Sequence, residues 1–194
     1  MNVYRLINSW KGGNLWEWGE MTVDILGNED KEAVLNGLMN TYGQDILRLV
    51  YSYVNDKAMA EDLTQEIFVK CYKSLHTYKG NANIKTWLWR IAINHCKDYL
   101  KSWHNKYVIV SENESTNTNT NKEMIEQLVI QKEDDHQLVI AIMNLPIKYR
   151  EVLYLFYYEN LSLKELSVLI GKNENTVKTR LRRAKELLKE RLEE

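Results

Sequence analysis

A single proline, Pro146, stands among the 194 residues of this chain, and only eight glycines accompany it. Proline and glycine are the residues that most strongly interrupt helices. Apolar residues recur nearly everywhere at the three- and four-residue spacing of an amphipathic helix. The sequence therefore predicts an all-α fold, with two small helical domains joined by a flexible linker and a helix-turn-helix in the C-terminal domain.

The net charge of the chain is only −1, but its charges alternate in blocks along the sequence. Residues 45–107 hold ten Lys or Arg against six Asp or Glu, and residues 145–194 hold eleven against eight. The blocks before and between them are acidic. Basic blocks of this kind are typical of surfaces that bind nucleic acid, so the sequence predicts two nucleic-acid-binding domains separated by a linker.

Four segments are expected along the chain. They are a poorly ordered tail over residues 1–28, a helical domain over 29–105, a flexible polar linker over 106–124 and a second helical domain over 125–194. Within the tail, either Met1 or Met21 could be the natural start. In the first domain we expect two helices broken near Gly43, the second of them ending at Asn55 and Asp56.

Residues 61–75 predict an amphipathic helix with two different faces. Its apolar residues form one stripe that would face a core: Leu63, Ile67, Phe68, Cys71 and Leu75. The opposite face gathers two carboxylates, an amide and a valine: Asp62, Gln65, Glu66 and Val69. An outward valine among polar groups suits a protein contact better than an ordinary solvated face, which is the alternative.

Residues 84–101 predict a second amphipathic helix of opposite charge. Its buried side would hold Ile84, Leu88, Ile91, Ala92, Cys96 and Tyr99. Its other side carries Thr86, Arg90, Asn94, Lys97 and Lys101, and cations and amides along one face fit a nucleic-acid backbone. Core packing is favoured over base stacking for Trp87, at the margin of this face, and Trp89 has no assigned role. His95 falls on the buried side, as a hydrogen-bonded core histidine.

The C-terminal fifty residues have the spacing of a helix-turn-helix. Pro146 begins a helix that runs through Tyr157, and Ser162 caps a short helix over residues 163–170. Gly171 supplies the turn, and a last helix runs from Glu174 to about Leu192, with Val177 and Leu181 directed to the core. Its outward face carries amide, hydroxyl and basic side chains that can reach base edges in a major groove: Asn175, Thr176, Lys178, Thr179, Arg182 and Arg183, with Arg180 on the flank.

The segments AEDLTQEIFVKCYKSL and TWLWRIAINHCKDYL resemble region two of bacterial extracytoplasmic-function sigma factors, the promoter-recognition subunits of RNA polymerase. The segment from Leu145 to Ala184 resembles region four of the same family. The resemblance implies that Asp62, Gln65, Glu66 and Val69 contact the clamp helices of the largest polymerase subunit. It also implies that a loop captures a flipped base of the minus-ten element: Lys79, Gly80, Asn81, Ala82 and Asn83.

The same resemblance assigns the DNA contacts of the two basic helices. Arg90, Asn94, Lys97 and Lys101 would hold the phosphates of the minus-ten strand. The outward residues of the last helix would read the minus-thirty-five element: Asn175, Thr176, Lys178, Thr179, Arg180, Arg182 and Arg183. Asn175 stands where the family often has glycine, and we expect this to alter a base contact rather than the fold.

The expected partners are core RNA polymerase, promoter DNA and an anti-sigma factor, which in this family is often anchored in the membrane. No cofactor, metal or small-molecule substrate is expected, because the histidines are scattered and no nucleophile or phosphate-binding motif occurs. An enzyme is therefore disfavoured. A conventional transcriptional regulator, with the first domain as a sensor, is the competing hypothesis. Without an apolar stretch of the ~18 residues that a membrane helix needs, and with Cys71 and Cys96 on core faces, a reducing cytoplasm is expected.

Overall fold

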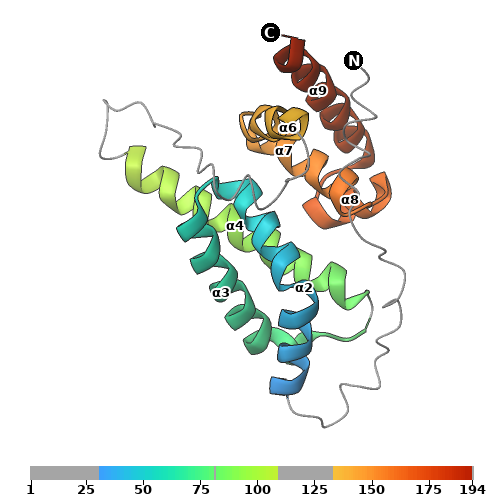
Figure 1. Ribbon diagram of the computed structural model, residues 1–194. Coiled ribbons are helices and arrows are strands. Elements are labelled where there is room, and N and C mark those ends of the chain that lie inside the picture. Colours follow the sequence, from blue (N-terminus) through green and yellow to red (C-terminus); the bar gives the residue numbers. More distant parts are fainter. Residues whose placement is uncertain (1–30, 81, 109–132, 194) are drawn as a thin grey trace. The chain divides into compact units, whose positions relative to one another are not determined.

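The structure is a computed structural model that describes residues 31–80, 82–108 and 133–193. All regular elements in these ranges are helical, which confirms the all-α prediction (Figure 1). They are α2 (Lys31–Val54), α3 (Lys57–Ser74), the 3-10 turn η2 (Leu75–Thr77), α4 (Ile84–Val108), α6 (Glu133–Met143), α7 (Ile147–Leu153), the π-helix η3 (Tyr154–Tyr158), α8 (Leu163–Ile170) and α9 (Glu174–Glu193).

The described helices fall into two compact units, α2–α4 and α6–α9. The predicted tail over residues 1–28 lies outside the described residues, as does most of the predicted linker. The first three linker residues, 106–108, belong instead to the end of α4. The domain boundaries themselves remain predictions.

The first unit packs its three helices around one core, because each helix turns an apolar stripe toward the other two. The predicted stripe of α3 is confirmed, with all five of its residues buried: Leu63, Ile67, Phe68, Cys71 and Leu75. Burial raises the pKa of the Cys71 thiol to about 12, so this thiol stays protonated and behaves as a small apolar core group.

The predicted helix break near Gly43 is wrong, since α2 runs unbroken from Lys31 to Val54. A glycine inside a helix costs only about 1 kcal/mol relative to alanine, and burial of Ile46, Leu49 and Val50 in the next two turns outweighs that cost. The stop after α2 is as predicted. Asn55 adopts a left-handed φ of 54°, and Asp56 caps α3 by accepting a hydrogen bond from the Met59 amide at 2.8 Å.

In the second unit, α9 packs against α6, α7 and α8. Its core combines leucines and valines from all four helices: Leu138, Val152, Leu166, Val177 and Leu188. The helix after Pro146 continues to Tyr158 as predicted, but from Tyr154 onward it widens into a π-helix. Tyr154 and Tyr158 stack there with ring centroids 4.8 Å apart, and Asn160, at a φ of 54°, follows the last turn.

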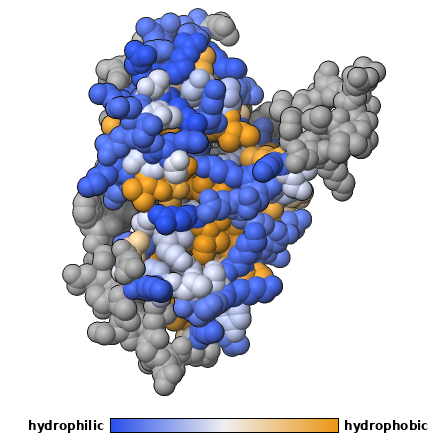
Figure 2. All heavy atoms as spheres, turned by 180° about the vertical axis from the view of Figure 1, so that it is seen from behind, coloured by the Kyte–Doolittle hydropathy of each residue, from blue (hydrophilic) through white to orange (hydrophobic). Residues whose placement is uncertain are grey.

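Hydrophilic residues cover most of the surface seen in Figure 2, with hydrophobic residues gathered near the middle of that view. Among the residues that the structure describes, Val69 and Val168 are the most exposed large hydrophobic ones, at 51% and 55%. Among the described helices, none combines the length and the apolar character that crossing a membrane requires.

Candidate functional site

The outward face of α3 gathers the four residues predicted to bind a protein partner. Asp62, Gln65, Glu66 and Val69 are all exposed, because their spacing places them opposite the buried stripe of the same helix. Val69 is half exposed. The structure therefore brings these residues together as one mixed acidic and apolar surface.

One residue of this face is tied to the neighbouring helix, which the sequence did not indicate. The Glu66 carboxylate lies 2.8 Å from Nε2 of His95 on α4. The other ring nitrogen, Nδ1, lies 2.7 Å from the Lys70 ammonium. His95 itself is buried, as predicted, at 8% exposure. Helical periodicity could not predict the contact between Glu66 and His95, because the two residues lie 29 positions apart in the sequence.

The loop between α3 and α4 is closed by its own hydrogen bonds. The Tyr78 hydroxyl donates to the Ala82 carbonyl at 2.6 Å, and Gly80 supplies a left-handed φ of 70° between them. The Asn83 side chain then accepts from the Lys85 amide at 2.8 Å, at the start of α4. Burial raises the pKa of Tyr78, so its hydroxyl remains a donor.

Of the five predicted loop residues, Lys79, Ala82 and Asn83 are exposed and Gly80 is half-buried, whereas Asn81 lies outside the described residues. Trp87 is half-buried and packs its ring against Tyr78, with centroids 5.4 Å apart. The sequence favoured core packing over base stacking for Trp87, and the structure places its half-buried ring against Tyr78, where it supports the loop.

On α4 the predicted strand-binding residues lie along one side. Arg90, Asn94 and Lys101 are exposed and Lys97 is half-buried. The buried side of α4 is broader than predicted, because this helix packs against both α2 and α3. Leu88, Ala92 and Cys96 are buried as predicted, but Ile84, Ile91 and Tyr99 are only half-buried, and the inner positions are completed by Trp89, Ile93 and His95.

Trp89, which had no predicted role, is 1% exposed and packs the start of α4 against α2. Its ring meets Tyr42 edge-on at 5.4 Å, and the Lys85 ammonium lies 4.9 Å from its centroid. Burial raises the pKa of nearby Asp45, although Lys85 and Arg48 oppose the rise. Burial, and then the charge of Asp45, raise the pKa of Tyr42.

The helix-turn-helix of α8 and α9 forms through the local signals that the sequence displays. The Ser162 hydroxyl accepts from the Glu165 amide at 3.3 Å, while the Glu165 carboxylate accepts from the Ser162 amide at 2.8 Å. The Ser162 hydroxyl also donates to the Glu165 carboxylate at 2.6 Å, and this bond, together with the one from the Ser162 amide, lowers the pKa of Glu165. Gly171 ends α8 at a φ of 67° and ψ of 40°, and Asn173 accepts from the Thr176 amide at 2.8 Å.

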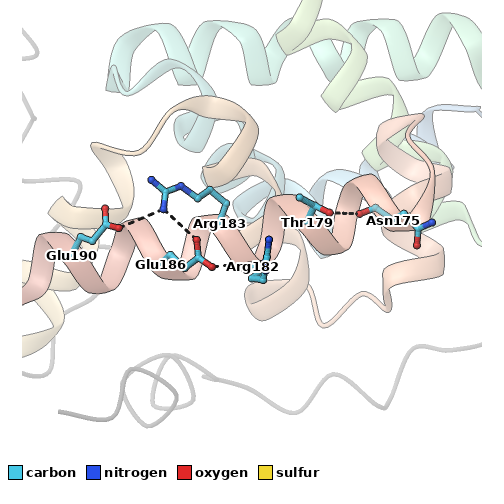
Figure 3. Close-up of polar contacts among 6 residues, drawn as sticks. All are labelled: Asn175, Thr179, Arg182, Arg183, Glu186 and Glu190. Carbon is cyan, nitrogen blue, oxygen red and sulfur yellow. Dashed lines mark hydrogen bonds and ion pairs between the residues drawn. The ribbon is translucent and has the colours of Figure 1, made fainter.

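Most predicted DNA-reading residues of α9 lie on its exposed side (Figure 3). Asn175, Lys178, Thr179, Arg182 and Arg183 are exposed, and Thr176 is half-buried. Val177 and Leu181 are buried on the other side, as predicted. The Thr179 hydroxyl donates to the Asn175 carbonyl at 2.8 Å.

The arginines of α9 have acidic neighbours that the outward-face pattern alone did not predict. Arg183 donates to Glu186 at 3.2 Å and to Glu190 at 3.4 Å (Figure 3). The hydrogen bond that Arg183 donates to Glu186 raises the pKa of Arg183. Arg180 differs from the others, because it turns inward to within 3.9 Å of Glu151, whose side chain is only 3% exposed.

Comparison with known proteins matches the two units to two regions of one protein family, sigma-70. Residues 38–105 match the family model of sigma-70 region 2, and residues 136–188 match that of sigma-70 region 4. The chain is 34% identical to the RNA polymerase sigma factor SigV of Bacillus subtilis (strain 168), over 81% of this chain and 90% of that protein. It is 32% identical to the ECF RNA polymerase sigma factor SigM of the same organism, over 80% and 93% of the two chains.

Solved structures share the fold. The sigma factor RpoE of Bartonella quintana, in complex with the anti-sigma factor NepR, superimposes with a TM-score of 0.66 at 19% identity, over 82% of this chain and 97% of that one. CnrH in complex with the cytosolic domain of CnrY gives a TM-score of 0.59 at 17% identity, over 97% and 96% of the two chains.

Proposed function

Because this chain belongs to the extracytoplasmic-function sigma factors of RNA polymerase, we propose that each surface described above serves one step of promoter recognition. The chain is an alternative sigma factor with a region 2 and a region 4. The observation that carries the proposal is the agreement between the two matched segments and the two helical units, each of which presents one of the predicted faces to solvent.

The outward face of α3 is the proposed contact with the clamp helices of the largest polymerase subunit. Asp62 and Glu66 offer carboxylates to basic partner residues, and Gln65 offers an amide. Exposed Val69 supplies the apolar contact that an interface core requires. The polymerase supplies the catalysis, and the sigma factor supplies promoter recognition.

The loop of residues 79–83 is the proposed pocket for a flipped base of the minus-ten element. Extruding a base costs a few kcal/mol in unstacking and pairing, so its pocket gains from being shaped in advance. The bond from Tyr78 to Ala82 and the ring of Trp87 give the loop that support. Arg90, Asn94, Lys97 and Lys101 on α4 would then hold the strand's phosphates.

The exposed side of α9 is the proposed reader of the minus-thirty-five element. Its first turns enter a major groove, where Asn175, Lys178 and Thr179 reach base edges. Arg182 and Arg183 lie one turn further along the same side. Arg180, which faces Glu151 in the structure, contributes less to DNA than its two neighbours.

We further propose that an anti-sigma factor controls this protein, because the similar structures of RpoE and CnrH hold such a partner or its cytosolic domain. Anchoring of that partner in the membrane would place the sigma factor at the inner face of the membrane until release. The protein itself would act in the cytoplasm, where it directs polymerase to genes of a stress or envelope regulon.

Charge reversal on α3 tests the polymerase-binding face. The double variant Asp62→Lys/Glu66→Lys should fold and fail to pull down core polymerase. A matched double variant reverses two exposed acids on other helices, Asp98→Lys/Glu174→Lys, and should bind as wild type does. Equal pull-down by both double variants would show that α3 is the wrong surface. Tight duplex binding in the absence of polymerase would favour the conventional regulator instead.

A further inference from the structure

His95 lies between the proposed polymerase-binding face of α3 and the proposed strand-binding side of α4, and it belongs to neither surface. It follows Asn94, which is exposed on the strand-binding side of α4, yet its own side chain is only 9% exposed and reaches α3. A buried imidazole costs free energy unless its ring nitrogens find hydrogen-bond partners. The partners that His95 has found are two charged residues of α3, Lys70 and Glu66.

The chemistry of these partners determines which nitrogen of the His95 ring carries the hydrogen. The Lys70 ammonium, 2.7 Å from Nδ1, has only donors, so Nδ1 must accept. The hydrogen is therefore on Nε2, which donates to the Glu66 carboxylate at 2.8 Å. A chain of two hydrogen bonds thus runs from a cation through the buried ring to an anion.

The consequence falls on Glu66, because its hydrogen-bond donor, His95, is held in the core. The Glu66 side chain is 62% exposed, and an exposed glutamate samples many rotamers that binding must freeze out. A donor on a ring locked in the core selects one orientation in advance. The carboxylate keeps further acceptor positions for a partner's cation, and ordering an interface side chain before association lowers the cost of binding.

We infer that His95 is a positioning residue that orients Glu66 for core RNA polymerase and so ties the polymerase-binding face of α3 to the DNA-binding helix α4. This inference rests on the proposed contact between Glu66 and the polymerase. It assigns to His95 an effect on polymerase affinity that operates only through the Glu66 carboxylate.

A double-mutant cycle with purified core polymerase and the full-length chain tests this dependence. The four proteins are the wild type, His95→Phe, Glu66→Gln and the double variant. Phenylalanine keeps a ring of similar shape in the buried site and removes both hydrogen bonds. His95→Leu repeats the cycle if the phenylalanine variant does not reach the thermal stability of a folded protein. The affinity for core polymerase is measured by biolayer interferometry.

With Glu66 present, the phenylalanine substitution should weaken polymerase binding about fivefold, the order expected for two residues in direct contact. In the Glu66→Gln background it should change the affinity by less than about twofold. His95→Gln, which keeps one donor and one acceptor, should restore most of the affinity. His76→Phe is the matched control, because His76 is exposed on η2, and it should bind as wild type does.

Two results overturn the inference while leaving the polymerase contact standing. One is an equal loss from His95→Phe in both backgrounds, which would make His95 a purely structural residue. The other is unchanged or tighter binding by His95→Phe, which would mean that the ring holds Glu66 away from the polymerase. A different result, wild-type affinity in Glu66→Gln, would remove Glu66 from the interface and so reject the proposed contact itself.

Discussion

Two glycines of this chain should respond in opposite directions to the same substitution. Gly171 ends α8 with a φ of 67°, a left-handed conformation that costs an L-residue about 1–2 kcal/mol. Gly43 lies inside α2, where glycine is about 1 kcal/mol worse than alanine. At both positions a new Cβ meets no atom within 4 Å. The backbone alone therefore decides the sign of each effect.

The expected magnitudes follow from these conformations. Gly171→Ala should destabilise the second unit by about 1 kcal/mol, after allowing for the reduced freedom of the unfolded chain. For a unit of this size that is a fall in melting temperature of roughly 4–8 °C. Gly43→Ala should stabilise the first unit by about 0.5–1 kcal/mol. Gly171→Asn should lose less than Gly171→Ala, because asparagine tolerates the left-handed region.

The assay can separate the two units. Among the described residues the tryptophans are Trp87, Trp89 and Trp103, all on α4, so their fluorescence reports on the first unit, whereas circular dichroism reports the helices of both units. Gly171→Ala should lower a circular-dichroism transition and leave the fluorescence transition in place. Gly43→Ala should raise the fluorescence transition. An unchanged or higher melting temperature for Gly171→Ala would show that the left-handed conformation of Gly171 does not limit the stability of the helix-turn-helix.

Three further predictions concern the DNA-binding residues. Arg182→Ala should weaken binding to minus-thirty-five duplex by about tenfold and leave core polymerase affinity unchanged; equal run-off transcription from variant and wild type would count against it. Arg180→Met should lower the unfolding free energy of the second unit by about 1–2 kcal/mol, since buried Glu151 loses a cation. It should weaken DNA binding less than Arg182→Ala does. A larger loss of DNA affinity from Arg180→Met than from Arg182→Ala would contradict the structure. Tyr78→Phe removes the hydrogen bond to the Ala82 carbonyl. The holoenzyme should then discriminate less between minus-ten bases on single-stranded templates. Preserved discrimination would show that the loop does not need this hydrogen bond.

Features written in consecutive residues were predictable from the sequence. The helix-turn-helix depends on Ser162, Glu165, Gly171 and Asn173, whose capping and turn contacts reach backbone groups three to five residues away. The grouping of the polymerase-binding residues on α3 was predictable for the same reason, because helical periodicity alone sets which side chains share a face. The role of that face follows from the resemblance and remains a prediction.

Features set by packing between helices were not predictable. The break expected at Gly43 does not occur because tertiary contacts outweigh the local preference of one glycine. Trp89 received no role because Tyr42, which its ring meets edge-on, lies on another helix. The link from Glu66 to His95 depends on the rotation of α3 against α4, which no local pattern records.

Run-off transcription with purified core polymerase tests whether this chain directs transcription from specific promoters. The templates are genomic promoters, beginning with the protein's own upstream region. Core polymerase should produce specific transcripts only when this chain is added. The α3 double variant Asp62→Lys/Glu66→Lys should abolish those transcripts, and Asp98→Lys/Glu174→Lys should retain polymerase binding. Failure of the wild-type chain to direct any promoter-specific transcript, with core polymerase shown to be active on another sigma factor, would contradict the account.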